Sequence, residues 1–263
     1  MKAAVQHASN GDVRIAYETR GTGDPVLLMH GLGYGRWGWE PLLEPLAAGF
    51  RVLFYDNRGI GDSDVPPGPY TARQLAGDAV AVLDAAGVER ADVVGTSLGG
   101  MAAQELALAF PERVRRLVLA CTTPGGRSAH PMPQQTVELM LAAPTLAPEV
   151  ALRRFVENAL APGAPDALVD RIYSLRLANP FDPNGWQSQA AAGVGFDAFD
   201  RVSGIEAPTL VVTGTADAVV DPRNSQLLAE RIPGARLERV PGGHLFFWED
   251  PARFATLVQE FLA

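Results

Sequence analysis

Short apolar runs alternate with amphipathic stretches along most of this chain. Each run is a nearly continuous row of apolar residues, as expected of strands that are buried on both faces of a parallel sheet. The predicted strands of this kind are Val26–Met29, Val52–Tyr55, Asp92–Val94, Leu117–Ala120 and Leu210–Thr213. The opening stretch Val13–Thr19 alternates apolar and polar residues, so it predicts an antiparallel strand at the edge of the sheet.

The amphipathic stretches predict the helices that cover this sheet. They are Ala72–Ala86, closed by Gly87, Gly99–Phe110, closed by Pro111, and, after the last run, Pro222–Arg231 and Pro251–Leu262. Strands that alternate with helices in this way indicate an α/β fold with a mostly parallel sheet and helices on both faces.

This alternation of strand and helix patterns stops between Pro124 and about Gly204. The stretch has no convincing strand and many prolines, and its helical patterns are Gln134–Ala143, Pro148–Leu160 and Asp166–Leu177. Because the strand pattern resumes at Leu210, we interpret residues 124–204 as a helical cap, or lid, inserted into the sheet domain. The core domain then comprises residues 1–123 and 205–263.

Composition and charge describe an ordinary globular protein of acidic character. Of the 263 residues, 47% are hydrophobic and 20% are charged, which is far from the composition of a disordered chain. The net charge of −8 argues against nucleic acids and anionic membranes as partners, because both require a basic surface. We therefore expect a small-molecule substrate and a monomer or homodimer.

Several kinds of site and location are not indicated by the sequence. The single cysteine, Cys121, rules out an internal disulfide and a cysteine-rich zinc site, and its apolar neighbours predict a buried, inert thiol. The histidines and carboxylates are too scattered to indicate a metal centre, and no cofactor is expected. The longest stretch without Asp, Glu, Lys or Arg, residues 183–196, is too short to span a bilayer. With no signal peptide visible, a cytoplasmic protein is the expectation.

The sequence Gly95-Thr96-Ser97-Leu98-Gly99 joins a predicted strand to a predicted helix. In this context the G-x-S-x-G pattern is a nucleophile elbow, in which a sharp turn raises the serine hydroxyl above the sheet. The turn strains the backbone of Ser97, while Gly95 and Gly99 allow the strand and the helix to approach closely. Ser97 is therefore the candidate nucleophile.

A serine hydroxyl needs a base to remove its proton, so a histidine is expected after Ser97. His7 lies in an N-terminal segment expected to be frayed, and His130 lies among the prolines of the cap. His30 precedes Ser97 and ends a strand, which favours a structural hydrogen-bonding role. The candidate base is therefore His244, in the glycine-rich loop that follows the run Arg236–Val240.

The acid that orients this histidine is expected at the carboxyl edge of the sheet, where ligand sites of such folds lie. Asp217 follows the predicted strand Leu210–Thr213 at that edge, and the order serine, aspartate, histidine is the one expected for this elbow. Asp221 is a nearby competitor, but it precedes Pro222 and is interpreted as the cap of the next helix.

Backbone N–H groups are also needed to stabilise the negative oxygen of a tetrahedral intermediate. One is expected from Leu98, directly after the nucleophile, and the other from Leu32, in the turn that follows the strand Val26–Met29. Beyond these, the candidate residues of an apolar substrate pocket are Trp37, Trp186, Phe196 and Leu245. For each of them, packing in the core is the competing interpretation.

Taken together, these motifs resemble the α/β-hydrolase fold family, in particular its small serine esterases and lactonases. The matching segments are His30-Gly31, Trp39, Asp56–Ser63, the elbow, Pro111–Val114, Gly214–Asp217 and Gly243-His244. They resemble 3-oxoadipate enol-lactonases and aclacinomycin-type methylesterases about equally. The resemblance implies an eight-stranded sheet and cleavage of carboxylic esters or lactones through an acyl-enzyme, without a cofactor.

Residue identity excludes some chemistries of this family and leaves others open. Family members that open epoxides or remove halogens have an aspartate where this chain has Ser97, and the hydroxynitrile lyases need a lysine near the histidine. The only lysine here is Lys2. Carbon–carbon bond hydrolases and cofactor-free perhydrolases use the same three residues and stay open. A ligand sensor that retains the triad is the alternative from another class, and sustained turnover distinguishes it from an enzyme.

Overall fold

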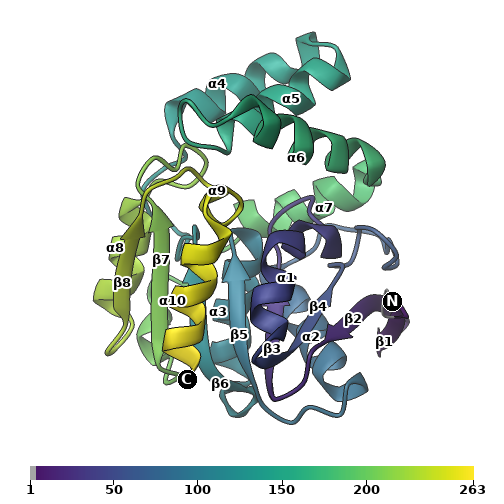
Figure 1. The fold of residues 1–263 in the computed structure, drawn as a ribbon, viewed down its shortest axis with the longest axis vertical. Helices are drawn as coiled ribbons and strands as arrows, with labels where there is room; N and C mark the ends of the chain where they lie inside the picture. The colour runs from purple at the N-terminus through teal and green to yellow at the C-terminus, as the bar shows by residue number, and fades with distance from the viewer. Residues whose placement is uncertain (1–3) are drawn as a thin grey trace.

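A mostly parallel sheet of eight strands runs through the middle of the computed structural model, which describes residues 4–263 (Figure 1). The strands are β1 (Gln6–Asn10), β2 (Val13–Arg20), β3 (Asp24–Met29), β4 (Phe50–Tyr55), β5 (Ala91–Thr96), β6 (Val114–Ala120), β7 (Thr209–Gly214) and β8 (Arg236–Val240). Their order is β1-β2-β4-β3-β5-β6-β7-β8, and β2 is antiparallel to both of its neighbours, β1 and β4. All other neighbouring strands are parallel, which confirms the predicted fold class.

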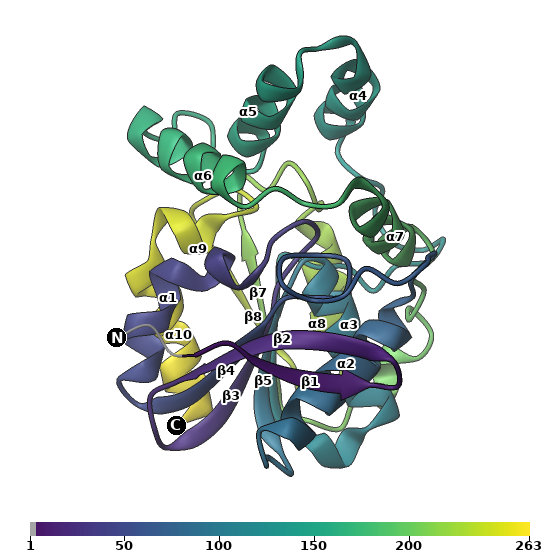
Figure 2. The same cartoon turned by 90° about the vertical axis from the view of Figure 1, so that its right-hand side faces the viewer.

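Helices cover both faces of this sheet, as Figure 2 shows. One face carries α1 (Glu40–Ala47), α9 (Phe246–Glu249) and α10 (Pro251–Leu262), and the other carries α2 (Ala72–Ala85), α3 (Leu98–Ala109) and α8 (Arg223–Arg231). Short 3₁₀ turns complete the core at η1 (Arg36–Trp39), η2 (Pro111–Arg113) and η4 (Val202–Gly204).

The two core layers follow from the alternation of side chains along the buried strands. In β3, Val26 and Leu28 pack in the cluster that includes Leu42 of α1, whereas Leu27 and Met29 pack in the opposite cluster. All four side chains are 0% exposed. Burial on both faces explains why these strands appear in the sequence as continuous apolar runs.

Between β6 and β7 the chain is helical. The helices are α4 (Gln134–Ala142), α5 (Pro148–Asn158), α6 (Asp166–Ala178) and α7 (Pro183–Val194), with the 3₁₀ turn η3 (Ala143–Thr145) after α4. Figure 2 shows α4, α5 and α6 standing above the sheet domain, whereas α7 lies lower, against its loops. An isolated bridge between Gly125 and Asp197 joins the two ends of the segment.

Several elements differ from the sequence interpretation. Strand β2, predicted at the edge of the sheet, lies inside it, because β1 pairs with its outer side, and helices α1 and α9 have no predicted counterpart. The segment expected to be frayed around His7 is strand β1, on which His7 is exposed and Ala8 is buried against the core. Helix α7 has no counterpart among the predicted helices, because its small and polar residues give a weak amphipathic pattern. Its start is fixed by Asp182, whose carboxylate accepts hydrogen bonds from the N–H groups of Asn184 and Gly185.

The described helices were also compared with the thickness of a bilayer. Within residues 4–263, no helix is both long enough and apolar enough to span a membrane.

Candidate active site

Ser97 occupies the sharp turn between β5 and α3. Its φ of 54° and ψ of −120° lie outside the regions that serine ordinarily adopts, as predicted for the elbow. The Ser97 N–H donates to the carbonyl of Ala120 (3.0 Å), and the Thr122 hydroxyl donates to the Ser97 carbonyl (2.7 Å). A Cβ atom on Gly99 would lie 2.0 Å from the carbonyl oxygen of Met29, so only glycine fits there. Neighbouring strands therefore hold the strained turn in place.

The elbow also exposes the serine. Between residues 91 and 100, Ser97 is the one residue that is not fully buried. Its hydroxyl makes no hydrogen bond within residues 4–263. The side chain is thus presented at the carboxyl edge of the sheet and remains available to a base and a substrate.

His244 and Asp217, which are 27 positions apart in the sequence, are in direct contact. Asp217 Oδ2 lies 2.8 Å from His244 Nδ1, and both residues are buried. Asp217 Oδ1 accepts two backbone N–H groups, from Val219 (2.8 Å) and Val220 (2.9 Å), which fix the carboxylate. A carboxylate only accepts hydrogen bonds, so His244 Nδ1 carries the proton and Nε2 is left as the basic nitrogen.

Asp221 has the role that its position before Pro222 predicts. Its carboxylate accepts from the N–H of Arg223 (2.9 Å), the first residue of α8, and pairs with the guanidinium of the same residue. The hydrogen bond from the Arg223 side chain is the main cause that lowers the pKa of Asp221. The carboxylate therefore serves the start of α8, whereas Asp217 faces the histidine.

The turn after β3 lies directly beside the elbow. A Cβ atom on Gly31 would lie 2.9 Å from Ser97 Cβ and 3.4 Å from Ser97 Oγ. Within residues 4–263, neither the N–H of Leu32 nor that of Leu98 has a hydrogen-bond acceptor. Two unpaired backbone donors beside a serine hydroxyl form the arrangement that an oxyanion requires.

His30 lies beneath this turn and has the structural role expected from its position. It is 2% exposed, its Nδ1 accepts from the N–H of Gly31 (2.7 Å), and its ring stacks on Tyr34. Burial is the main cause that lowers its pKa to about 3, and the charges of His244 and Arg176 lower it further. His30 is therefore neutral at ordinary pH and acts as a buried acceptor.

The loop after β4 supports the same turn from below. Asp56 accepts from the N–H of Arg36 (2.6 Å) and from that of Asp62 (3.0 Å), and the Asn57 amide donates to the carbonyl of His30 (3.0 Å). Burial raises the pKa of Asp56, while the Arg36 guanidinium opposes that effect. These contacts explain the polar residues in 56–63 as a support for the turn rather than as a ligand site.

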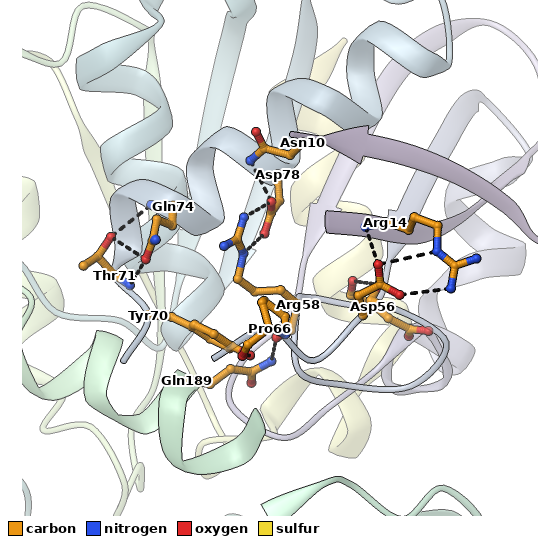
Figure 3. A network of polar contacts seen from close by, with 12 residues as sticks. Asn10, Arg14, Asp56, Arg58, Pro66, Tyr70, Thr71, Gln74, Asp78 and Gln189 are labelled. Atoms are coloured by element: carbon orange, nitrogen blue, oxygen red, sulfur yellow. Dashed lines mark hydrogen bonds and ion pairs between the residues drawn. The ribbon is translucent and has the colours of Figure 1, made fainter. Parts of the chain in front are cut away.

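An ion pair of the same loop reaches α2. Both guanidinium nitrogens of Arg58 that face Asp78 lie 2.6 Å from its carboxylate oxygens, and the Asp78 side chain is fully buried (Figure 3). Asn10 of β1 donates a further hydrogen bond to Asp78 (2.9 Å). The hydrogen bond with Asp78 raises the pKa of Arg58 and so keeps it charged.

The four proposed pocket residues are distributed over different surroundings. Trp186 of α7 lies against the turn, since a Cβ atom on Gly33 would be 3.0 Å from its indole ring. Trp37 is half-buried beside Tyr34. Phe196 and Leu245 are buried within the two core clusters, on opposite faces of the sheet. Trp186 is thus the residue of this set that the structure brings next to the turn carrying Leu32.

The remaining candidates concern cysteine and metals. Cys121 is 1% exposed, as predicted, and burial raises the pKa of its thiol. Among the residues that the structure describes, no group of three or more histidines, cysteines, aspartates or glutamates is arranged to hold a metal ion. Sequence reasoning did not find Gln189, a buried residue of α7 that bonds to Gly33 of the turn. No local pattern marks it, because its partners are distant in the sequence.

Comparison with known proteins gives relatives over nearly the whole chain. A protein of Azorhizobium caulinodans provisionally named carbamate hydrolase RutD is 34% identical over 269 residues, with 97% of each chain covered. A 2-hydroxy-6-oxononadienedioate/2-hydroxy-6-oxononatrienedioate hydrolase of Burkholderia vietnamiensis is 36% identical over 274 residues, covering 95% of this chain and 91% of the relative.

Solved structures agree with these sequence relatives. The enol-lactonase of Burkholderia xenovorans LB400 superimposes with a TM-score of 0.85 at 28% identity, covering 98% of this chain and 99% of that one. The family model described as the alpha/beta hydrolase fold matches residues 24–251, from β3 to the start of α10. The chain therefore belongs to the α/β-hydrolase fold family, and it is similar to hydrolases of the esterase and lactonase type.

Proposed function

We propose that this protein cleaves carboxylic esters or lactones of small to medium apolar substrates through an acyl-enzyme formed on Ser97. The observation that supports it best is the combination at one edge of the sheet: a strained, partly exposed serine, two unpaired N–H groups beside it, and a histidine bonded to a buried aspartate. The printed names of the relatives, which include an enol-lactonase, agree with hydrolysis of this kind.

In the proposed mechanism, His244 Nε2 removes the proton of Ser97 as the hydroxyl oxygen attacks the carbonyl carbon. The electron pair of the C=O bond moves onto oxygen, where the N–H groups of Leu32 and Leu98 stabilise the negative charge. The intermediate collapses, the alcohol oxygen leaves with the proton held by His244, and the acyl group stays on Ser97. Water then attacks the acyl-enzyme, with His244 again as the base, and releases the acid.

Asp217 holds the histidine in the form that this mechanism needs. Its bond to Nδ1 fixes the tautomer with a free Nε2, and its negative charge stabilises the imidazolium that forms in each half-reaction. The two backbone N–H groups on its other oxygen keep the carboxylate from rotating away from the ring.

The experiment that tests this proposal is covalent labelling with a fluorophosphonate, followed by mass mapping of the modified peptide. We expect one label on Ser97, and none in Ser97→Ala. A panel of esters of graded acyl length, run beside lactones of matching size, then identifies the substrate class by kcat/KM. A label on another residue, or full hydrolysis by Ser97→Ala, would exclude the proposed mechanism.

Carbon–carbon bond hydrolysis is the second candidate, since a relative with 36% identity is named for a substrate that the same three residues can cleave. A dienoate ring-fission product is the discriminating substrate, because its turnover requires protonation of carbon and not only departure of an alcohol. Release of one product equivalent per protein, with no further turnover on any substrate, would instead favour a ligand sensor.

A further inference from the structure

Gln189 joins the cap to two loops of the core. The residue belongs to α7 and its side chain is completely buried, at 0% exposure. Its Oε1 accepts from the N–H of Gly33 (3.3 Å), and its Nε2 donates to the carbonyl of Arg58 (2.7 Å). Figure 3 shows Gln189 beneath Arg58, on the side away from Asp78. One side chain of the cap therefore holds both the turn after β3 and the loop after β4.

The two partners determine how the amide must be oriented. Gly33 offers a donor and Arg58 an acceptor, so the oxygen has to face Gly33 and the nitrogen has to face Arg58. A carboxylate, an apolar side chain or a reversed amide cannot form both bonds. The site is therefore specific for a primary amide or for a group of equal shape that both donates and accepts.

Close backbone contact fixes the position of α7 independently of Gln189. A Cβ atom on Gly185 would lie 2.1 Å from the carbonyl oxygen of Gly59, so helix and loop meet without a side chain between them. Tyr70, beyond that loop, donates its N–H to the carbonyl of Ser188 (3.2 Å). Because these contacts already fix α7, the Gln189 side chain can hold its two hydrogen-bond partners, Gly33 and Arg58, in place.

Gly33, to which Gln189 bonds, is the neighbour of the proposed oxyanion donor. Gly33 follows Leu32 directly, and its backbone has a φ of 72°, which a glycine adopts without strain. Loss of the bond to Gln189 removes the hydrogen bond from α7 to the turn and leaves the packing of Trp186 as its contact with that helix. The N–H of Leu32 would then sample directions that miss the oxygen of the intermediate, and oxyanion stabilisation depends strongly on this geometry.

We propose that Gln189 is a positioning residue for catalysis, which aims the Leu32 N–H by fixing the turn Gly31–Gly33. The proposal rests on the proposed function, because it assigns to Gln189 a role in stabilising the oxyanion of that reaction. Its consequence is that the cap supports bond cleavage itself through one residue, in addition to shaping the substrate pocket.

The test compares Gln189→Met with Gln187→Met on one ester that the wild-type protein turns over. Met has the length of Gln but forms neither bond, and Gln187 is exposed two positions away on the same helix. For Gln189→Met we expect kcat to fall about 10- to 100-fold, part of the loss seen when an oxyanion donor is removed, with KM changed less than about threefold. Gln187→Met should match the wild type in both constants.

A second variant, Gln189→Glu, separates positioning from packing. A protonated carboxyl has the shape of the amide and can accept from Gly33 while donating to Arg58, whereas the ionised form cannot donate. Burial raises the pKa of a carboxyl, so protonation is within reach on the acid side of neutrality. The charged and titratable side chains on the surrounding elements are His30, Tyr34, Arg36, Asp56, Arg58, Asp62, Asp64, Tyr70, Asp78, Arg176 and Asp182.

The readout is the ratio of kcat between Gln189→Glu and the wild type as a function of pH. The dependence on His244 is common to both proteins and cancels in the ratio. We expect the ratio to rise as the pH falls, while the ratio for Gln189→Met stays flat. Thermal unfolding of each variant is measured at the same pH values, so that a loss of folded protein is not counted as a loss of kcat.

Several outcomes would overturn the proposal. Unchanged kcat in a folded Gln189→Met, a fall confined to KM, or a flat ratio for Gln189→Glu each exclude a positioning role. If Gln189→Met does not fold, the pH profile of Gln189→Glu decides alone. Failure of the proposed function is distinguishable, since it appears as absent turnover or absent Ser97 labelling in the wild type, before any variant is compared.

Discussion

The cap contacts two loops of the core that carry proposed catalytic groups, but the two contacts are built differently. At α7, the side chain of Gln189 bonds to the turn that carries Leu32. At the connection between α5 and α6, the carbonyl of Ala159 accepts from the N–H of Leu245, directly after the histidine (2.8 Å). In the first contact the cap contributes one specific side chain. In the second it contributes only backbone atoms, the carbonyl of Ala159 and the N–H of Ala161, which donates to Glu249 of the core.

The side chains that surround the two contacts differ as well. Beneath α7 lies the buried ion pair of Arg58 with Asp78. Around α4, α5 and α6, apolar side chains are exposed, namely Met132, Val137, Met140, Leu141, Val150 and Leu177. Helix α7 also exposes Val194, but its Gln189 is fully buried against two loops of the core. We therefore expect α7 to behave as part of the core and the upper helices to tolerate sequence change more readily. The experiments below test that division, beginning with the largest expected effect.

Asp217→Asn removes the carboxylate that is proposed to orient His244. Because an amide favours the wrong tautomer of His244, kcat should fall about 10³- to 10⁴-fold, as for the corresponding change in other triads. Steady-state kinetics on the best ester measures it, with circular dichroism to confirm the fold. Asp221→Asn is the matched control and should lose less than about threefold in kcat, because its carboxylate serves α8. A larger loss for Asp221→Asn would reverse the assignment.

Asp78→Asn should destabilise the protein strongly, because it leaves the buried guanidinium of Arg58 without its counter-charge. Breaking a buried ion pair costs about 3–5 kcal/mol of unfolding free energy. Asp170→Asn breaks the exposed pair with Arg153 in the cap and should cost less than about 1 kcal/mol. Urea unfolding of the two variants measures both values. Equal losses of unfolding free energy in the two variants would contradict the division between the region beneath α7 and the upper cap.

Acid should lower the free energy of unfolding of the protein through buried His30. Its pKa is lowered to about 3 in the folded protein, so between that value and about pH 6.5 the unfolded chain binds more protons. The stability contributed by neutral His30 is complete above about pH 6.5 and is lost at up to about 1.4 kcal/mol per pH unit as the pH falls.

The check is urea unfolding at several pH values between 7.5 and 4.5. His30→Gln lacks the titrating group, so its unfolding free energy should decrease less than that of the wild type over this range. Parallel curves for the two proteins would assign the acid sensitivity to other groups.

Trp186→Ala should alter which acyl chain is preferred, since its indole lies against the turn beside the proposed site. Reshaping an apolar pocket changes discrimination between chain lengths by about 1–3 kcal/mol. The ratio of kcat/KM across the ester panel measures this, and labelling of Ser97 by a small phosphonate should hardly change. An unaltered ranking of esters would remove Trp186 from the pocket.

The smallest expected effect concerns the contact between the upper cap and the loop that carries His244. Glu249 accepts from the N–H groups of Gly243 (2.7 Å) and Ala161 (3.2 Å), so Glu249→Ala should lower kcat about tenfold by loosening the His244 loop. Ala159→Ser keeps the backbone bond to Leu245 and should leave kcat within about twofold of the wild type. Equal losses in the two variants would contradict the distinction between side-chain and backbone contacts.

The division also explains what the sequence could predict. The buried strands, the elbow and the candidate residues after β7 and β8 follow from local patterns, because each lies at the end of an apolar run. Helix α7 and Gln189 do not, since the bonds of that residue reach 156 and 131 positions along the chain. Strand β1 is too polar on its outer face to stand out. Phe196 and Leu245 are buried in the core clusters, and their place in the substrate pocket stays a prediction.

The bridge between Gly125 and Asp197 has a consequence for engineering and for evolution. Because the two ends of the insertion already meet, the segment between them can change length at little entropic cost, as each doubling of a loop costs only about 0.6 kcal/mol. Exchange of residues 127–180 for the corresponding helices of another hydrolase would replace α4 to α6 while retaining α7. Such a chimaera would inherit a foreign substrate preference on an unchanged catalytic base, so new specificities could arise here by recombination rather than by gradual substitution.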